Sequence, residues 1–264
     1  MVERRKPIFV VPLELGAIAS GNEGAGTPAK HLNRRNSVGL VWRTTSGANA
    51  WARGQFTEPQ LIDFCALLAT NAATGTKVRL RLGATQAEVD GTAPYDSGPQ
   101  SIMLPDQIAG PANSHLELDE PQQATWWRID VMGHTGPFQA AILVLGEKIE
   151  PSHFYNFDPE FSVQDLGTLQ LSRWGVFDEA PGRVLQTVDF TLGWQSEDAF
   201  ETKWRPAMKQ LGERGVIYCC FDPAPNVYRN GRTFLGPMRK APAAKGTRKP
   251  KTYTQDFSLL SILP

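Results

Sequence analysis

The sequence predicts a mainly β protein with two modules, a β-sandwich of the jelly-roll type followed by a second β-rich module that contains one α-helix. Three observations support this class. Short runs of alternating apolar and polar side chains recur about every ten residues. The 24 glycines and 20 prolines favour frequent turns. Only one stretch of the chain has the period of an amphipathic helix.

The clearest strand is the stretch from Ala124 to Val131. Trp127, Ile129 and Val131 share one side of an extended chain. The residues between them include Arg128 and form a polar, cationic side. This alternation predicts a strand of a β-sandwich.

The remaining strands of the first module follow from the same patterns. Residues 7–15 predict a short apolar strand, and the Gly/Ala/Ser-rich residues 16–30 predict a flexible connector that lets it pair with a distant strand. Further strands are predicted over residues 38–43, 51–56, 61–70, 76–82, 100–104, 114–118, 124–131 and 139–145. Residues 61–70 are apolar on both sides, as expected for a central strand that is covered on both faces. Residues 83–98 predict a turn-rich passage.

The second module begins after a stretch without a period. Residues 150–167 combine aromatic side chains with Pro and Asp, which indicates a linker or an aromatic-anchored loop. Strands are predicted over residues 168–174, 183–194, 216–221, 232–238 and 253–263, the first two forming a hairpin. The predicted divisions of the chain are an N-terminal strand and connector over 1–30, the sandwich over 31–149 and the second module over 150–264.

The single predicted helix lies in the second module, from about Glu197 to Leu211. Ser196 can cap its N-terminus and Gly212 suits its exit. Large apolar side chains recur along one face of this helix. They belong to Phe200, Trp204, Met208 and Leu211. Pro206 lacks a backbone donor, so it should kink the helix or mark the end of a short first segment.

The net charge, the length of the apolar stretches and the number of cysteines limit what this protein can bind and where it can be assembled. The 27 basic and 27 acidic residues give a formal net charge of zero, so no global field attracts nucleic acid or an anionic membrane. No apolar stretch reaches the length of a transmembrane helix. The odd number of cysteines, Cys65, Cys219 and Cys220, predicts reduced and buried thiols, which suits a protein assembled in a cytoplasm.

The sequence shows no catalytic or cofactor motif, so we predict that the protein is not an enzyme and needs no cofactor or metal. The scattered histidines make a zinc site improbable. They are His31, His115, His134 and His153. Asp158 and Glu160 flank a proline, which indicates a solvated turn rather than paired catalytic carboxylates. Asp119 or Glu120 could contact calcium, although no loop has the dense acidic spacing of a dedicated site.

Aromatic and arginine residues could form a sugar platform, because aromatic faces stack on sugar C–H groups and arginine donates to hydroxyls. The residues considered are Trp42, Trp51, Arg53, Tyr95, Trp126 and Arg128. Four of these are the glycan-binding candidates, namely Trp51, Arg53, Tyr95 and Trp126. The alternative is that these side chains pack in the core or against neighbouring strands.

A basic run without acidic residues lies between Met238 and Lys251. Its cationic residues are Arg239, Lys240, Lys245, Arg248, Lys249 and Lys251. Such a run could contact phosphate or an acidic neighbouring subunit. The alternative is a solvated loop that joins two strands.

Residues 36–146 resemble the discoidin-like (galactose-binding-like) jelly rolls found in proteins of tailed-phage virions. The resemblance is carried by residues 61–71, 76–83, 94–98 and 127–131. Residues 139–263 look like the companion segment of the same phage proteins, with a hairpin, a helix and a strand that ends near Asp222 and Pro223. In known distal-tail proteins the ring-forming domain comes first. Because the order here differs, the resemblance favours a baseplate-associated protein that is related in parts.

This resemblance implies a non-enzymatic structural component of the tail tip or baseplate of a long-tailed (siphophage-like) phage. Such a component would form a ring around the tail axis and connect the tail tube to distal tip proteins. Its partners would be copies of itself and the tube, hub and tape-measure proteins, in a virion assembled in the host cytoplasm. The alternative is a carbohydrate-binding or receptor-adhesion module that contacts host surface glycans. A hydrolase of cell-envelope polymer ranks below both, since no base, nucleophile or metal set is visible.

Overall fold

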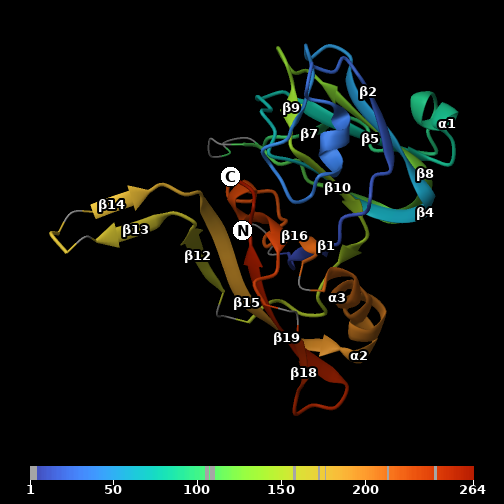
Figure 1. Ribbon diagram of the computed structural model, residues 1–264. Helices are drawn as coiled ribbons and strands as arrows, with labels where there is room; N and C mark the ends of the chain where they lie inside the picture. The colour runs from blue at the N-terminus through green and yellow to red at the C-terminus, as the bar shows by residue number, and fades with distance from the viewer. Residues whose placement is uncertain are drawn as a thin grey trace. The chain divides into compact units, whose positions relative to one another are not determined.

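The computed structural model describes residues 5–104, 107, 111–156, 159–171, 173–175, 177–212, 214–240 and 243–264. The protein is mainly β, as predicted, and its strands form several antiparallel sheets (Figure 1). It divides into two compact units. The first consists of Met1–Glu150 and Val216–Thr233, and the second consists of Pro151–Gly215 and Phe234–Pro264.

The first unit is built on a seven-stranded antiparallel sheet in the order β10-β4-β8-β5-β6, with β2 paired to β4 and β7 paired to β5. These strands are β2 (Ala17–Gly21), β4 (Ala50–Leu68), β5 (Lys77–Gly83), β6 (Tyr95–Asp96), β7 (Gln100–Ser101), β8 (Leu116–Met132) and β10 (Ile142–Gly146). Smaller pairings join β3 (Trp42–Arg43) to β9 (Gln139–Ala140) and place β1 (Ile8–Val10) between β11 (Lys148–Ile149) and β16 (Val216–Cys220). The helices of this unit are η1 (Ala29–Asn33), α1 (Gln86–Asp90) and η3 (Asn230–Arg232).

Two long strands replace pairs of shorter predicted ones. Residues 51–56 and most of 61–70 belong to the single strand β4, and residues 114–118 and 124–131 belong largely to β8. The pairing of β4 with β8 changes register between Gln55 and Gln60, and again between Ile62 and Phe64. Pro59 lies within the first irregularity, and Pro121 lies on β8 opposite the second. Because proline cannot donate to a ladder, each interrupts the pairing without ending the strand.

The core of the first unit lies on one side of the sheet. Trp127, Ile129 and Leu80 are fully buried there, and the indole Nε1 of Trp127 donates to the carbonyl of Leu15 at 3.2 Å. The second half of β4 is buried on both faces from Ile62 on, which confirms the predicted central strand. The predicted alternation of residues 76–82 is also confirmed, with Arg79 and Arg81 on the face away from this core.

Several expectations for the first unit were wrong. The predicted flexible connector over 16–30 contains β2, which pairs with β4. The predicted strand over 38–43 is limited to two residues. The turn-rich passage contains α1, whose Thr85 and Glu88 form a capping box. Residues 216–220, expected in the second module, form β16 and pair with β1, so the first strand does find a distant partner.

The second unit contains a four-stranded sheet in the order β12-β15-β19-β18 and a separate two-stranded sheet of β13 and β14. The strands are β12 (Glu160–Asp165), β13 (Thr168–Leu171), β14 (Phe177–Ala180), β15 (Val184–Ser196), β17 (Thr233–Pro237), β18 (Ala243–Gly246) and β19 (Thr252–Leu260); the boundary between the units falls within β17. The predicted hairpin between residues 168–174 and 183–194 was wrong, because β13 pairs with β14 whereas β15 pairs with β12 and β19. The predicted linker over 150–167 contains β12.

The predicted helix is present as three consecutive segments, α2 (Glu197–Ala199), the π-helical η2 (Phe200–Trp204) and α3 (Arg205–Leu211). The hydroxyl of Ser196 accepts a hydrogen bond from the backbone N–H of Ala199 at 3.2 Å, as expected for an N-cap. The π-helical segment ends where Pro206 removes a backbone donor, which confirms the predicted irregularity. Phe200 stacks on Tyr253 with ring centroids 4.4 Å apart, so the helix covers one face of the sheet.

Candidate functional site

The part of the chain that the structure describes holds no group of three or more His, Cys, Asp or Glu side chains placed to bind a metal ion. Within the same residues, no helix is long and apolar enough to cross a membrane.

The three cysteines are free and buried, and burial raises the pKa of Cys65 to about 12. Asp119 and Glu120, the calcium candidates, lie exposed on β8. Asp158 lies outside the described residues.

The outer side of the sheet in the first unit brings together charged side chains from β4, β8 and β5. The strand register places Trp51 opposite Asp130, and Asp130 opposite Arg79. The next row places Arg53 opposite Arg128, and Arg128 opposite Arg81. We call this surface the arginine face. It consists of Trp51, Arg53, Arg79, Arg81, Trp126, Arg128 and Asp130.

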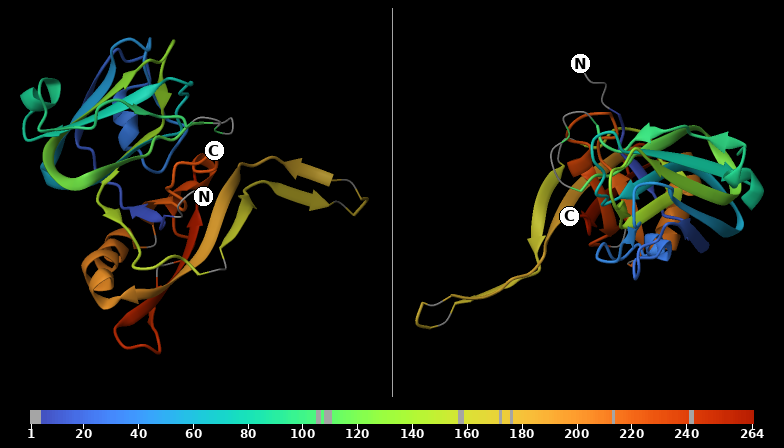
Figure 2. Two further views of the ribbon diagram at one scale, coloured as in Figure 1. Left: turned by 180° about the vertical axis from the view of Figure 1, so that it is seen from behind. Right: turned by 90° about the horizontal axis from the view of Figure 1, so that it is seen from above.

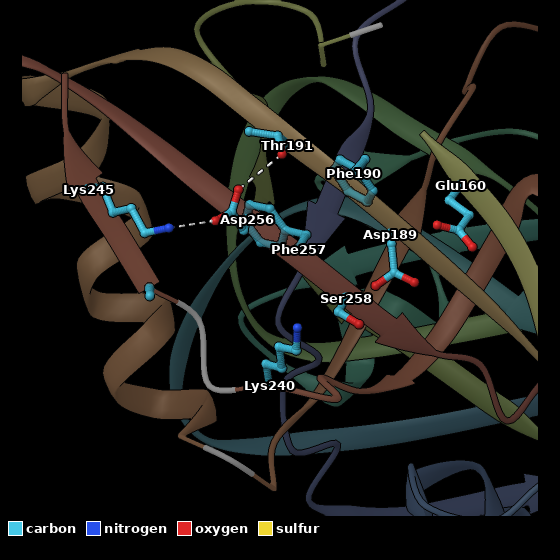
Figure 3. Close-up of a pocket in the computed structure, with 10 residues that line it drawn as sticks. Glu160, Asp189, Phe190, Thr191, Lys240, Lys245, Asp256, Phe257 and Ser258 are labelled. Atoms are coloured by element: carbon cyan, nitrogen blue, oxygen red, sulfur yellow. Dashed lines mark hydrogen bonds and ion pairs between the residues drawn. The ribbon is translucent and has the colours of Figure 1, made fainter. Parts of the chain in front are cut away.

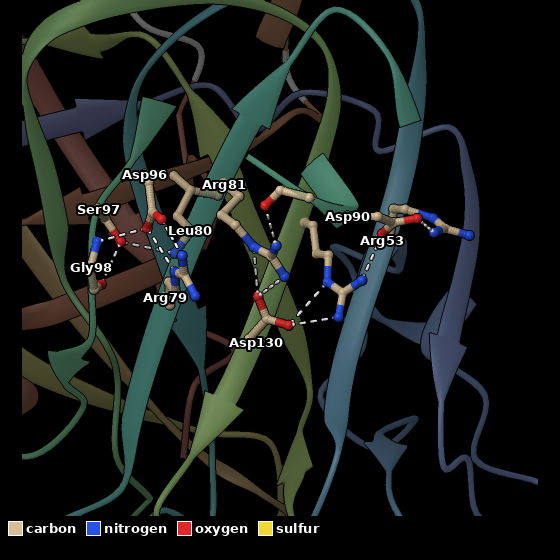
Figure 4. A network of polar contacts seen from close by, with 11 residues as sticks. Arg53, Arg79, Leu80, Arg81, Asp90, Asp96, Ser97, Gly98 and Asp130 are labelled. Carbon is tan, nitrogen blue, oxygen red and sulfur yellow. Dashed lines mark hydrogen bonds and ion pairs between the residues drawn. The ribbon is translucent and has the colours of Figure 1, made fainter. Parts of the chain in front are cut away.

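Ion pairs connect the arginine face in a network (Figure 4). Asp130 contacts Arg81 at 2.6 Å and Arg128 at 2.9 Å. Asp90, at the end of α1, contacts Arg128 at 2.6 Å and also pairs with Arg53. The capping box stabilises the start of α1, and α1 in turn places Asp90 beside Arg53 and Arg128.

Arg79 holds a separate carboxylate, that of Asp96 on β6. Its Nε donates to Asp96 at 2.7 Å, and its Nη2 donates to the other carboxylate oxygen. This hydrogen bonding holds the pKa of Asp96 below its ordinary value. Burial alone would raise the pKa of Asp90, but the guanidinium groups of Arg128 and Arg53 outweigh burial and lower it. Both carboxylates are therefore ionised at neutral pH.

The structure brings four of the six sugar-platform residues together and separates the other two. Trp51, Arg53, Trp126 and Arg128 lie on the arginine face. Tyr95 packs against the core on the opposite side of the sheet. Trp42 is completely buried and contacts Phe138 edge to face, with ring centroids 5.8 Å apart. A platform role for Trp42 was therefore wrong, because its ring has no exposed face.

Trp51 is packed more closely than an open sugar platform would be. The guanidinium carbon of Arg128 lies 4.5 Å from the centre of its ring, and that of Arg53 lies 5.2 Å away. The five-membered part of the indole lies against Gly21, where an added Cβ would come 2.2 Å from Nε1. Cross-strand packing, the alternative reading of the pattern, therefore describes much of the environment of Trp51.

A second candidate surface is an extended arm in the second unit. We define the β-arm as residues 160–184, which include β12, β13 and β14. In the views of Figures 1 and 2, β13 and β14 extend away from the four-stranded sheet of their own unit. Among the described residues, seven of the twelve exposed large hydrophobic side chains belong to the β-arm. They are Phe161, Val163, Leu166, Leu169, Leu171, Trp174 and Val184.

Three of the six cations of the basic run have ion-pair partners in the second unit. Arg239 pairs with Asp189 at 3.6 Å, and Lys245 pairs with Asp256 at 3.2 Å. Lys251 lies 3.9 Å from Glu197. Part of the run forms β18, so the alternative of a simple solvated loop was also incomplete.

A depression of about 460 Å³ adjoins the basic run in the second unit (Figure 3). Lys240 and Lys245 line it together with Glu160, Asp189 and Asp256. These opposite charges lie close to one another, which lowers the attraction of this region for phosphate. Arg248 and Lys249 do not line the depression.

Comparison with known proteins gave structural matches only. No family model matches the chain, and no curated protein matches it. A fucose binding module of Streptococcus pneumoniae matches with a TM-score of 0.39 and 12% identity over 51% of this chain and 95% of that one. The Clostridium perfringens module CpGH89CBM32-5, in complex with GalNAc-β-1,3-galactose, matches with a TM-score of 0.39 and 15% identity over 52% of this chain and 99% of that one.

A third match is reduced XRCC1 bound to the DNA pol beta catalytic domain, with a TM-score of 0.39 and 13% identity over 52% of this chain and 99% of that one. The similar structures thus include proteins whose described partners differ in kind. At TM-scores of this size they support no inference about the ligand of this chain. The two surfaces described above must therefore carry any functional proposal.

Sequence reasoning missed both the ion-pair network and the β-arm. The outward positions of Arg79 and Arg81 were visible from the alternation of residues 76–82. Asp96, the partner of Arg79, and Asp90, the partner of Arg128 and Arg53, could not be identified, because β6 and α1 lie in a stretch that was interpreted as turns. Leu169 and Leu171 share the spacing of a buried strand face, so their exposure could not be predicted.

Proposed function

We propose that the protein is a non-enzymatic structural subunit that assembles with copies of itself through the β-arm of its second unit. The observation that supports this is the concentration of exposed apolar side chains along the β-arm. Trp174 is 77% exposed, and Leu169 and Leu171 are 66% and 64% exposed. Large apolar side chains exposed close together in the sequence indicate an interaction site, since folded monomers rarely expose large apolar patches.

The construction of the β-arm supports the same proposal. A two-stranded hairpin is at best marginally stable in water, because each strand lacks a partner on one side. The pairing of β13 with β14 forms such a hairpin. Packing the apolar side chains against another subunit would remove them from water, at roughly 25 cal/mol per Å² of apolar surface.

The setting we propose is a phage tail tip or baseplate. The resemblance of residues 36–146 and 139–263 to segments of tailed-phage proteins supports it. Copies of the chain would form a closed ring around the tail axis, since closed cyclic assemblies leave no unsatisfied interface. The tube, hub and tape-measure proteins of the tail would be its other partners, and the virion its final location.

Light scattering after size-exclusion chromatography tests self-assembly. The wild-type protein should elute as an oligomer whose mass falls on dilution. The double variant Leu169→Ser/Leu171→Ser should shift toward monomer by at least tenfold in dissociation constant. The matched control is Leu61→Ser, because Leu61 is 44% exposed and lies in the first unit. A wild-type monomer at every concentration, or equal effects of the two replacements, would contradict the proposal.

A second candidate function is glycan recognition by the first unit. It is favoured by the two tryptophans of the arginine face, Trp51 and Trp126, the first of which lies beside the guanidinium groups of Arg53 and Arg128. Trp126 is half-buried and lies opposite Gly83, so no side chain of β5 stands directly beside it. Sugar rings could use such an indole as an apolar wall.

Binding to a glycan array tests this candidate. The variants Trp51→Ala and Trp126→Ala should lose binding while their circular dichroism and melting temperature stay close to wild type. Binding that survives both replacements would show that the arginine face is not the site.

A further inference from the structure

We infer that the arginine face holds a site for an acidic sugar, in which Arg79 receives the anionic group. The inference rests on the second candidate function and names its ligand class. The site is a depression of about 220 Å³ on the outer side of the sheet. Trp51 and Asn49 line one end, Arg79 and Arg81 the other, and Asp130 lies between them.

The carboxylate of Asp130 in this depression already accepts hydrogen bonds from Arg81 and Arg128. One oxygen of Asp130 accepts from Nε of Arg81 at 3.0 Å and from its Nη2 at 2.6 Å. The other oxygen accepts from Nε of Arg128 at 3.0 Å and lies 2.9 Å from its Nη2. A carboxylate has about four lone-pair sites, so Asp130 has no acceptor left for a sugar hydroxyl.

The donors are not exhausted. A guanidinium carries five N–H groups, and the hydrogen bonds from Arg79 to Asp96 use two of them. The side chain of Arg79 is 33% exposed, so its remaining N–H groups can reach solvent. The depression therefore offers hydrogen-bond donors to a ligand and requires acceptors from it.

The net charge of the arginine face also favours an anionic ligand. The network contains three arginines, Arg53, Arg81 and Arg128, and two aspartates, Asp90 and Asp130, while Arg79 forms its own pair with Asp96. The network thus carries one net positive charge. A carboxylate on the ligand would neutralise this charge, and guanidinium–carboxylate hydrogen bonds are stronger than neutral ones.

The size and the wall of the depression select a single sugar ring. A volume near 220 Å³ is below the roughly 300–1,000 Å³ of sites for drug-sized molecules. Trp51 and Met132 also line the depression and can supply apolar contacts. A uronic acid combines both features, because it places a carboxylate on a ring with apolar C–H groups.

Titration calorimetry with galacturonate and galactose tests this inference on the full chain. Galacturonate should bind at least tenfold more tightly than galactose, and Arg79→Gln should remove that preference. The matched control is Lys77→Gln, which removes an exposed positive charge from the same strand outside the depression. Lys77→Gln should keep at least half of the wild-type affinity.

Binding measurements with other ligands distinguish failure of the acidic-sugar site from failure of glycan recognition as a whole. If acetate or sulfate binds as tightly as galacturonate, the sugar ring contributes nothing and the inference is overturned. If galactose or neutral glycans alone bind, glycan recognition stands and the acidic-sugar site does not. If no saccharide binds, both fail. Because Arg79→Gln also removes the partner of Asp96, nuclear magnetic resonance of the wild-type protein provides a second readout, in which galacturonate should shift the Trp51 indole signal.

Discussion

At the scale of single residues, His115 of the first unit is a buried polar group with hydrogen-bond partners at both ring nitrogens. Its Nε2 lies 3.1 Å from Glu117, and its Nδ1 lies 3.2 Å from the hydroxyl of Tyr218. Phe64 contacts both rings. Burial lowers the pKa of His115 despite the neighbouring carboxylate, so the imidazole is held neutral at physiological pH.

Glu117 is the counterpart of this histidine. Burial alone would raise its pKa, but hydrogen bonds from His115 and Arg5 outweigh burial, and the pKa lies well below its ordinary value. Arg5 binds both carboxylate oxygens, at 2.6 and 2.8 Å. Glu117 therefore remains ionised throughout the range in which His115 could titrate.

We predict that the free energy of unfolding falls between pH 7 and about pH 5 because of His115. The unfolded chain binds a proton near pH 6.5, whereas the folded protein resists it, so the contribution is present above that pH and is lost as the pH falls. Urea denaturation at several pH values measures this slope. His115→Gln should reduce it, while Leu80→Ala, in the buried core of the first unit, should destabilise the protein and leave the slope unchanged. An unaltered slope in His115→Gln would refute the assignment.

The contacts of individual side chains were harder to predict from the sequence than the strands and the helix. The positions of Arg79, Arg81 and Arg128 on one face followed from alternation with period two. Which carboxylates they meet did not, because Asp90 and Asp96 come from short elements with few residues to reveal a period. Trp42 carried no signal that would distinguish a buried indole from an exposed one.

At the scale of elements, the helix over residues 197–211 was the most predictable feature. Its cap, its apolar stripe and its exit glycine all lie in the local sequence. Gly212 has a φ of 51°, in the left-handed region that glycine adopts without strain. Local signals of this kind need no knowledge of tertiary contacts.

We predict that Ser196→Ala lowers the free energy of unfolding of the second unit by about 0.5–2 kcal/mol, because the N–H of Ala199 loses its acceptor. Guanidinium denaturation monitored by helical circular dichroism measures the loss. Ser101→Ala, at an exposed position of the first unit, serves as the control and should change stability by less than about 0.5 kcal/mol. Equal effects of both replacements would argue against a stabilising cap.

Strand boundaries were harder to predict than the helix. Separate strands were predicted over residues 51–56 and 61–70 and over 114–118 and 124–131, although the long strands β4 and β8 continue through Pro59 and Pro121 with a change of register. The partners of β15 could not be inferred from order along the chain, because β12 and β19 lie on either side of it. Non-local pairing depends on contacts that no single segment specifies.

At the scale of the whole molecule, the first unit is discontinuous in sequence. Its sheet of β11, β1 and β16 joins residues near 9, 149 and 219. Phe64 of β4 and Tyr218 of β16 contact each other with ring centroids 4.8 Å apart. The first unit is interrupted after Glu150 and resumes at Val216.

We therefore predict that a fragment of residues 31–149 does not fold as an independent domain. It lacks β1, β2 and β16, and would expose the apolar face of β4 and β10 that carries Phe64 and Val144. Proton–nitrogen correlation spectra should show narrow amide dispersion and no cooperative melting. The full chain should show both dispersion and cooperative melting. A well-dispersed spectrum of the fragment would show that the added strands are dispensable.

We propose that the chain is an assembly subunit whose β-arm contacts another copy. Electron cryo-microscopy of the concentrated full-length protein, or of a virion that contains it, can show this contact. We expect several copies around a symmetry axis, with residues 160–184 of each copy buried against a neighbour. Isolated monomers, or a ring in which Leu169, Leu171 and Trp174 remain in solvent, would contradict it.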